Sequence, residues 1–529
     1  MPGFDRPSAT RRPWLTGVAA TVAGAVLLAG CSTPDTGAVT DELFPSASAQ
    51  EYEPGPNVLE EAGLGGYYGQ ALDWRECQGG LACAEVVVPR DYAKPGDGEV
   101  VLSVARRPAR SPEKRLGAIV VNPGGPGGSG VGMAIDAQYY FSKQILERFD
   151  IVGFDPRGVA ASDPIACGDA RFLDDYLAAD ATPDSPAEID RLDELSRQFA
   201  ELCSAKSGEM LPHLGTFDVA RDLDILRAAL GEEQLSFMGK SYGTFIGAAY
   251  ADLFPERVGR MVLDGAIDPS ISGEQLALDQ AIGFEEALDR FIADCNRQTD
   301  CPLPDGVRAG RQTIANLLSR IDARPLPTDQ RNRPLTEALA IYGLAGGLYD
   351  DIDGWGFLRL ALARALEGDG ADLLFLVDLY TDRTPDGEYA SNATEALVAV
   401  NCFDKPAGPP LAEVPALARE WGRKAPIFGP YLAWSGLPCA YWPVHAAEPP
   451  RPLPARGAPP ILILGTTHDP ATPVKWARSL AEQLESGVYL EWQGDGHTAH
   501  GRGSACVDDI VDRFYLEGAV PVDASVCPP

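Results

Sequence analysis

The hydrophobic positions between residues 83 and 269 alternate between the patterns of buried strands and of helices. Continuous apolar runs in "GAIVVNPGG" and "DIVGFDPRG" predict buried strands, and "VGMAIDAQYYFSKQILERF" between them predicts a helix. Farther along, "FDVARDLDILRAAL" has helical spacing and precedes the short strand "LSFMG", and the helix "TFIGAAYADLF" precedes the strand "GRMVLDGAI". This alternation predicts an α/β fold, with a mostly parallel sheet and helices on both faces.

The alternation stops near residue 269 and resumes near residue 461. Segments such as "EQLALDQAIGFEEALDRFIADC" and "WGFLRLALARALEGDG" predict helices over most of residues 270–446. Residues 447–460 contain six prolines and predict a stiff connection. Strand and helix patterns return in "ILILGTT", "WARSLAEQL" and "VYLEWQG". We therefore expect one sheet domain built from residues 70–269 and 447–529, interrupted by a helical cap at 270–446.

The first 31 residues have the pattern of an export signal. Arg11 and Arg12 precede an apolar stretch at residues 15–30, which is short for a membrane span and typical of a signal-peptide core. The stretch ends in "LAGC", which resembles the lipobox of bacterial lipoproteins, so we expect Cys31 to carry lipid. A cleaved signal peptide without lipid is the alternative, and "TRRPWL" is also similar to a twin-arginine signal. Residues 32–69, small and polar in their first part, predict a flexible tether.

These N-terminal features predict an exported protein, held at the extracellular face of the cell membrane by its N-terminal lipid only, with release from the cell as an alternative. Cysteine usage supports export, because ten cysteines remain after Cys31 and an even number suits disulfides. We expect neighbours in chain order to pair, because each pair then closes a local loop. The ten are Cys77, Cys83, Cys167, Cys203, Cys295, Cys301, Cys402, Cys439, Cys506 and Cys527. No Cys-x-x-Cys spacing occurs and histidines number five, so no metal site is expected.

The charge of the chain excludes some classes of partner. The formal net charge is −32, which opposes binding to nucleic acid or to anionic lipid by charge. Such a charge suits a soluble surface that repels other copies, and we expect a monomer.

One short motif predicts a catalytic nucleophile. "GKSYG" places Ser241 between Gly239 and Gly243, which matches G-x-S-x-G. In that motif a strand turns sharply into a helix and exposes the serine hydroxyl, and the two glycines avoid collisions across the turn.

A serine nucleophile needs a base and an acid that orients the base. His497 lies in the glycine-rich loop "QGDGHTAHG", which follows a strand, and His500 in the same loop is the alternative base. Asp469 follows the strand "ILILG" and is the expected acid, with Asp264 as a second candidate. Asp495 is interpreted as a solvated loop charge. The order of nucleophile, acid and base along the chain is that of α/β-hydrolases.

An oxyanion hole needs two backbone N–H groups. Tyr242 follows the nucleophile and supplies one of them, and the glycine-rich loop "NPGGPGGSG" at residues 122–130 is the expected source of the other. A phosphate-binding loop is the rival interpretation, but neither G-x-x-x-x-G-K-[ST] nor G-x-G-x-x-G fits. No cofactor is expected.

Several segments together resemble one family. "NPGGPGGSG", "FDPRG", "RDLDILRAALGEEQLSFMGKSYGT", "LDGAIDP", "CAYWP", "HDPATP" and "GDGHT" are similar to segments of exported tripeptidyl aminopeptidase-like serine hydrolases, relatives of prolyl iminopeptidase. The resemblance extends from about residue 70 to the C-terminus. It implies the α/β-hydrolase fold with a cap and the release of short peptides, tripeptides among them, from free N-termini.

The resemblance also implies roles for single residues. They are Ser241 as nucleophile, Asp469 as acid, His497 as base, and Tyr242 with Gly124 or Gly125 as oxyanion donors. Relatives mostly have an uncharged residue at the position of Lys240, so we expect this lysine to alter the charge of the substrate pocket.

Peptide substrates with a free N-terminus are cationic and require a fixed anion. We expect the cap to supply it, and the candidates are Asp350, Asp351 and Asp404. An esterase or other acyl hydrolase with the same triad is the alternative function, because one fold hosts both activities. A lipid-anchored binding protein is a third hypothesis, which the intact catalytic motifs disfavour.

Overall fold

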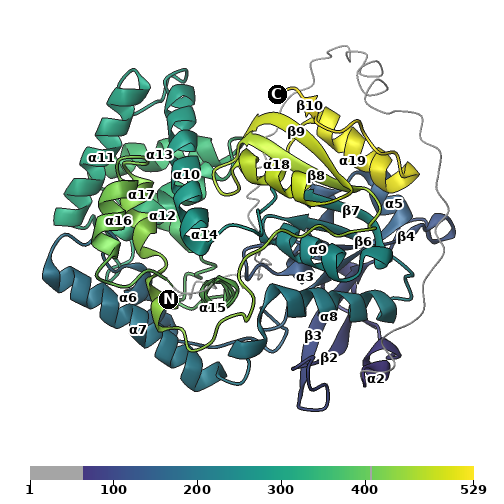
Figure 1. The fold of residues 1–529 in the computed structure, drawn as a ribbon. Helices are drawn as coiled ribbons and strands as arrows, with labels where there is room; N and C mark the ends of the chain where they lie inside the picture. The colour runs from purple at the N-terminus through teal and green to yellow at the C-terminus, as the bar shows by residue number, and fades with distance from the viewer. Residues whose placement is uncertain (1–62, 406–407) are drawn as a thin grey trace, which may run out of the picture.

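The protein is described by a computed structural model that covers residues 63–405 and 408–529. Its centre is a ten-stranded sheet with the order β1-β2-β3-β5-β4-β6-β7-β8-β9-β10 (Figure 1). The strands are β1 (Arg75–Glu76), β2 (Ala82–Pro89), β3 (Glu99–Arg107), β4 (Gly117–Asn122), β5 (Phe149–Phe154), β6 (Leu235–Lys240), β7 (Val258–Asp264), β8 (Ile461–His468), β9 (Gly487–Asp495) and β10 (Ser525–Cys527). The predicted lipidation of Cys31, the signal segment 1–31 and most of the tether lie outside the described residues.

The sheet is mostly parallel, which confirms the predicted fold class. The pairs from β5 through β4, β6, β7, β8 and β9 to β10 are parallel, whereas β1, β2 and β3 join the other edge in antiparallel fashion. Strands β6, β7 and β8 are adjacent although the whole helical segment separates β7 from β8 in the sequence. The C-terminal βα units therefore complete the sheet that the first half of the chain begins.

Helices cover both faces of the sheet, which explains why β4 and β5 are buried at every position. Val120 of β4 packs in the core cluster that includes one set of helices, and Ile119 and Val121 pack in the cluster that includes the other set. The first set is α8 (Thr216–Ala229), α9 (Tyr242–Leu253) and α18 (Val474–Gln483). The second set is α3 (Gly130–Ile135), α5 (Lys143–Arg148) and α19 (Ala505–Glu517), with the short α4 (Ala137–Tyr140) after α3.

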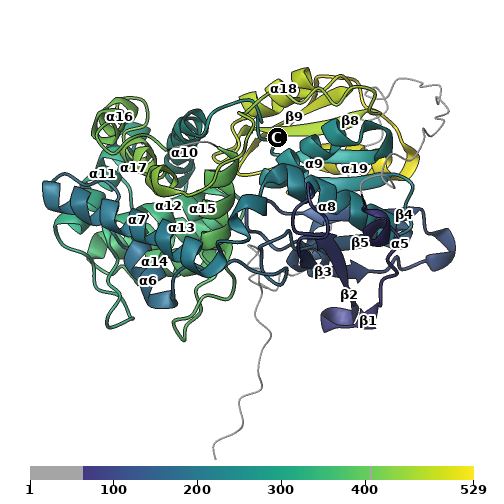
Figure 2. The same ribbon diagram turned by 60° about the horizontal axis from the view of Figure 1, so that its bottom comes forward.

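A helical layer lies beside the sheet and has a hydrophobic core of its own (Figures 1 and 2). It contains α10 (Gly273–Cys295), α11 (Val307–Ala323), α12 (Glu337–Leu348), α13 (Gly354–Glu367), α14 (Ala371–Tyr380), α15 (Ala393–Asp404), α16 (Val414–Trp421) and α17 (Phe428–Trp434). The layer also includes α6 (Ala170–Leu177) and α7 (Pro186–Ser207), which come from the range 70–269. Leu192 of α7, for example, packs with Val414 and Trp434. The cap in space is therefore assembled from two separate parts of the chain.

Five disulfides join the ten cysteines of the described chain in the order in which they occur, which is the expected pairing. The pairs are Cys77–Cys83, Cys167–Cys203, Cys295–Cys301, Cys402–Cys439 and Cys506–Cys527. Among the helices that the structure describes, none is long and apolar enough to cross a membrane.

Candidate active site

Ser241 occupies a sharp turn between β6 and α9. Its φ is 54° and its ψ is −124°, a conformation that residues with a side chain rarely adopt. A Cβ atom at Gly239 would lie 2.3 Å from the carbonyl oxygen of Gly243, and a Cβ at Gly243 would lie 2.7 Å from that of Asn122. Both glycines are therefore required by close backbone contacts. The Ser241 N–H donates to the carbonyl of Asp264 at 2.9 Å, which fixes the turn to the end of β7.

Asp469, which is buried, pairs with the half-buried His497. The Nδ1 of His497 lies 2.9 Å from each carboxylate oxygen of Asp469. The carboxylate also accepts the N–H groups of Ala471, Thr472 and Thr498 at 2.8–2.9 Å and the Thr472 hydroxyl at 2.9 Å. Burial alone would raise the pKa of Asp469, but the charge of His497 and these hydrogen bonds outweigh it and keep the pKa below its usual value. Asp469 is thus held as a carboxylate.

His497 is fixed from its other side by the helical layer. The backbone N–H of His497 donates to the backbone carbonyl of Tyr349 at 2.8 Å. The His497 ring packs edge-on against the Tyr349 ring, with 5.2 Å between the ring centroids. A Cβ at Gly265 would lie 3.4 Å from Cε1 of His497, so the imidazole adjoins the residue that follows Asp264. Ser241 and His497 therefore both lie near the end of β7.

The described residues show no hydrogen bond between Ser241 Oγ and His497. Catalytic hydrogen bonds are often long before substrate binds.

The alternative base, His500, is buried in the core. Its ring packs against Phe141 at 5.8 Å between centroids, and only its backbone groups contact Lys240 and Asp264. Burial and, secondarily, the charge of Lys240 lower the pKa of His500 to about 3. A ring in this environment suits a structural role.

Asp264, the second candidate acid, and Asp495 also have other partners. The Asp264 carboxylate lies 2.8 Å from Lys240 Nζ and accepts the N–H of Ala499 at 2.7 Å. Asp495, interpreted from the sequence as a solvated loop charge, instead binds Arg290 with both oxygens at 2.6 and 2.7 Å, and its side chain is 18% exposed. Lys240 itself has a side chain only 8% exposed and does not line the cavity beside Ser241. The expectation that Lys240 alters the charge of the substrate pocket is therefore wrong, because its charge faces Asp264 in the core.

The structure distinguishes between the two glycines proposed as donors in the oxyanion hole. The N–H of Gly124 donates to Asn122 Oδ1 at 2.9 Å, so this N–H already has an acceptor other than substrate. A Cβ at Gly124 would lie 2.8 Å from the backbone nitrogen of Tyr242, which explains the glycine at this position. Gly125 lines the same cavity as Ser241. The Tyr242 N–H belongs to the first turn of α9, whose amides lack intrahelical partners. Tyr242 and Gly125 are thus the better pair of donors.

The cavity at Ser241 has a volume of about 620 Å³ and extends into the helical layer. Its wall includes five tyrosines, which sequence reasoning missed, namely Tyr176, Tyr342, Tyr349, Tyr380 and Tyr431. Their rings contact one another across helices, for example Tyr349 with Tyr380 at 5.6 Å between centroids. In the sequence these tyrosines have the spacing of ordinary core residues, so no signal identified them.

The three acids expected to bind the substrate amine do not line this cavity among the described residues. Asp404 accepts the N–H and hydroxyl of Thr216 at 3.1 and 2.5 Å, and burial raises its pKa to about 6. Asp350 and Asp351 both form ion pairs with Arg502. The charged side chains that do line the cavity are Glu274, Lys405 and Glu413. Both glutamates are exposed residues near helix N-termini, a common position for surface acids, and sequence reasoning missed them.

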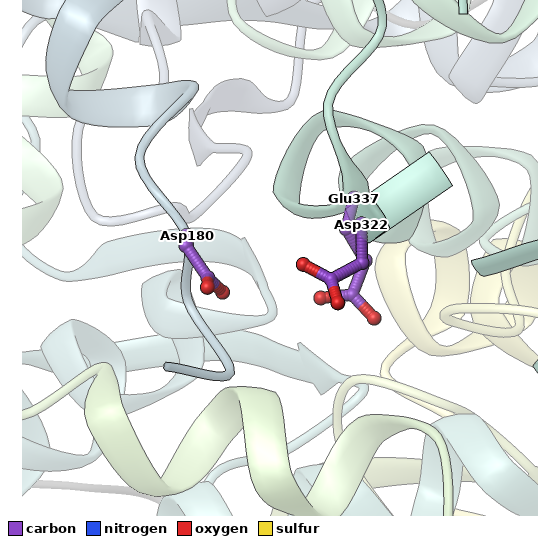
Figure 3. Close-up of side chains that lie close together, drawn as sticks. All are labelled: Asp180, Asp322 and Glu337. Carbon is purple, nitrogen blue, oxygen red and sulfur yellow. The ribbon is translucent and has the colours of Figure 1, made fainter. Parts of the chain in front are cut away.

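A separate group of carboxylates lies in the helical layer (Figure 3). Asp180, Asp322 and Glu337 place their oxygen atoms within 4.8 Å of one another. Burial, followed by repulsion from neighbouring acids, raises the pKa of Glu337 to about 7, although Thr182 donates a hydrogen bond to it. None of the three lines the cavity at Ser241, so the group is not part of the candidate active site.

Comparison with known proteins finds relatives over most of the chain. Serine protease Hip1 of Mycobacterium tuberculosis is 35% identical over 484 residues, which cover 87% of this chain and 91% of that protein. Carboxylesterase B of the same organism is 37% identical over 499 residues, covering 90% and 94%. Tripeptidyl aminopeptidase of Streptomyces coelicolor is 33% identical over 477 residues, covering 87% and 86%. A family model described as TAP-like protein matches residues 425–527. The chain therefore belongs to the family of tripeptidyl aminopeptidase-like α/β-hydrolases.

Proposed function

We propose that the protein is a serine exopeptidase that releases short peptides, tripeptides among them, from free N-termini. One observation carries the proposal: the buried Asp469 carboxylate orients His497 at the end of the sheet, near the strained turn of Ser241. A serine in this setting has a neighbouring imidazole as its base, and a carboxylate orients that imidazole. These are the requirements for nucleophilic catalysis by serine.

The reaction follows from the positions of these groups. His497 Nε2 takes the proton of Ser241 as Oγ attacks the scissile carbonyl carbon, and the N–H groups of Tyr242 and Gly125 stabilise the negative oxygen. His497 then donates that proton to the leaving amine, and water releases the acyl group by the reverse exchange. Asp469 stays ionised and keeps the Nδ1 proton of His497 directed toward it.

The cavity supports an exopeptidase more than an endopeptidase. The helical layer encloses the space beside Ser241, and a cavity of about 620 Å³ admits a short segment of chain. Glu274 and Glu413 supply carboxylates for the substrate's ammonium group, in place of the three aspartates expected from the sequence. One relative is itself named a tripeptidyl aminopeptidase.

An acyl esterase is the second candidate. The tyrosine-rich wall favours apolar acyl groups, and one relative of 37% identity is named carboxylesterase B. The two candidates differ in whether the substrate needs a free amine.

We also propose that Cys31 anchors the protein to the outer face of the membrane through lipid, on the basis of "LAGC" after a signal-like segment.

The proposed activity is tested by incubating the purified full-length protein with a mixed peptide library and identifying the products by mass spectrometry. We expect products shortened from the N-terminus with wild-type protein and none with Ser241→Ala. Each cleaved peptide is then compared with its N-acetylated form and with a matched ester. Equal cleavage of free and acetylated peptides contradicts the exopeptidase, and hydrolysis of the ester alone selects the esterase.

A further inference from the structure

Asp264, the last residue of β7, contacts both parts of the proposed catalytic site. Its carbonyl accepts the N–H of Ser241 at 2.9 Å. Its fully buried carboxylate accepts the N–H of Ala499 at 2.7 Å and that of His500 at 3.0 Å, which follow His497 in the same loop. One residue thus joins the turn of the nucleophile to the loop of the base.

Lys240 reaches the same loop from β6. Its Nζ lies 2.8 Å from Asp264 Oδ2, 2.7 Å from the carbonyl oxygen of His500 and 3.4 Å from Thr498 Oγ1. Lys240 immediately precedes Ser241, but its side chain is buried in the core while Ser241 lines the cavity. The sharp turn at Ser241 separates the two side chains.

The stability of the fold does not explain this ion pair. A buried pair loses much hydration, and apolar residues of similar volume often serve stability as well or better. Apolar side chains, however, would leave the loop's N–H groups and the His500 carbonyl without partners. The pair of Lys240 and Asp264 instead fixes three peptide groups within the segment that follows His497.

We propose that Lys240 and Asp264 are positioning residues that hold the loop at 497–500 so that the His497 imidazole stays beside Ser241. They touch neither substrate nor the reacting atoms. The inference rests on the proposed function, in which His497 is the base. It also gives a role to the lysine that departs from the family pattern.

The test is Lys240→Met, assayed at a temperature well below the unfolding transition. We expect kcat to fall by about 10- to 100-fold with little change in KM, because a misplacement of about 1 Å has this effect on a catalytic group. Asp264→Asn and the double variant Lys240→Met with Asp264→Asn complete a double-mutant cycle, in which kcat is measured for each variant. The loss in the double variant should be smaller than the product of the single losses, since each single change leaves a buried charge unpaired.

Arg227→Met is the matched control. Arg227 lies 2.8 Å from Asp224, and this pair has 10% and 0% exposed side chains against 8% and 0% for Lys240 and Asp264. Asp224 keeps other partners, such as Arg257, and the pair lies on α8 without contact to the loop. We expect this variant to lose stability and to keep its kcat.

A readout independent of turnover is the downfield proton resonance of the His497 Nδ1–H bond to Asp469. Lys240→Met should shift or broaden this resonance, and Arg227→Met should leave it unchanged. The proposal is overturned if folded Lys240→Met has the kcat and the resonance of the wild type. It is also overturned if Arg227→Met loses as much kcat as Lys240→Met. If Lys240→Met does not fold, the double variant decides by the same measurements. Failure of wild-type protein to react with a serine-directed phosphonate refutes the proposed function instead, and the resonance still tests the positioning.

Discussion

Replacing Asp469 by asparagine tests the candidate triad most directly, because the structure indicates how the amide will sit. Oδ1 accepts the N–H groups of Ala471 and Thr472, whereas Oδ2 accepts the Thr498 N–H and the Thr472 hydroxyl. An amide nitrogen at the Oδ1 position would face two backbone donors, and at the Oδ2 position only one. The substituted side chain should therefore place its amide nitrogen at the Oδ2 position.

That orientation changes the state of the imidazole. The new amide N–H points at His497 Nδ1, which must then accept, so the ring carries its proton on Nε2 and cannot remove the proton of Ser241. We expect kcat to fall by roughly 10⁴-fold, the effect of the same tautomer change in other triads. The Thr498 N–H also loses its acceptor, and an unpaired buried donor lowers the free energy of unfolding by about 1–3 kcal/mol.

The assay measures two quantities on Asp469→Asn. The rate of labelling by a serine-directed phosphonate reports the nucleophile without a need for the natural substrate, and denaturant unfolding reports the stability. Asp495→Asn is the matched control, because it removes the same charge two residues before His497 but breaks only the ion pair with Arg290. A labelling rate within tenfold of wild type in folded Asp469→Asn would refute the assignment of the acid.

Three further predictions follow from the same structure. His497→Ala should reduce phosphonate labelling by roughly 10⁶-fold, whereas His500→Ala should keep most activity because its contacts to the positioning pair are made by the backbone; similar losses in both would contradict the geometry. Glu337 has a pKa of about 7, above its unfolded value of 4.5, so the folded state binds more protons and its stability falls as pH rises from about 4.5 to 7. Glu337→Gln should therefore raise the free energy of unfolding at pH 8, by on the order of 2 kcal/mol, and should have little effect at pH 4. Denaturant unfolding measures both values, and equal effects at the two pH values would show that ionisation of Glu337 is not the cause. Cys31→Ala should move the protein from the membrane fraction to the soluble fraction, and unchanged fractionation would exclude the lipid anchor.

The features that could be predicted from the sequence are those that depend on neighbours along the chain. The G-x-S-x-G turn needs glycines at fixed positions because of close backbone contacts, so the motif alone predicted the sharp turn at Ser241. Strands and helices of the sheet domain could be predicted equally well, since buried strands such as β4 are apolar at every position but the last. The order of the disulfides also followed from short loops.

The features that were missed depend on residues far apart in the sequence. Asp350 and Asp351 were plausible ligands for a cation until Arg502, about 150 positions later, was found to bind both. By contrast, the choice between Gly124 and Gly125 depended on a near neighbour, Asn122, because the sequence does not show which way its side chain points. No local pattern shows whether a charged residue already has a distant partner.

The division of the site between sheet and cap has a consequence for specificity. The groups proposed to perform the chemistry follow strands of the sheet, and their positions are fixed by hydrogen bonds among β6, β7 and the loops after β8 and β9. Much of the cavity wall comes instead from helices of the cap, including Tyr176 of α6 and Tyr342 of α12, which lie far apart in the sequence. Substitutions in the cap can therefore change which acyl group is accepted while the sheet keeps the catalytic groups in place. A family with this construction can include both peptidases and esterases, and the names of its members agree with that expectation.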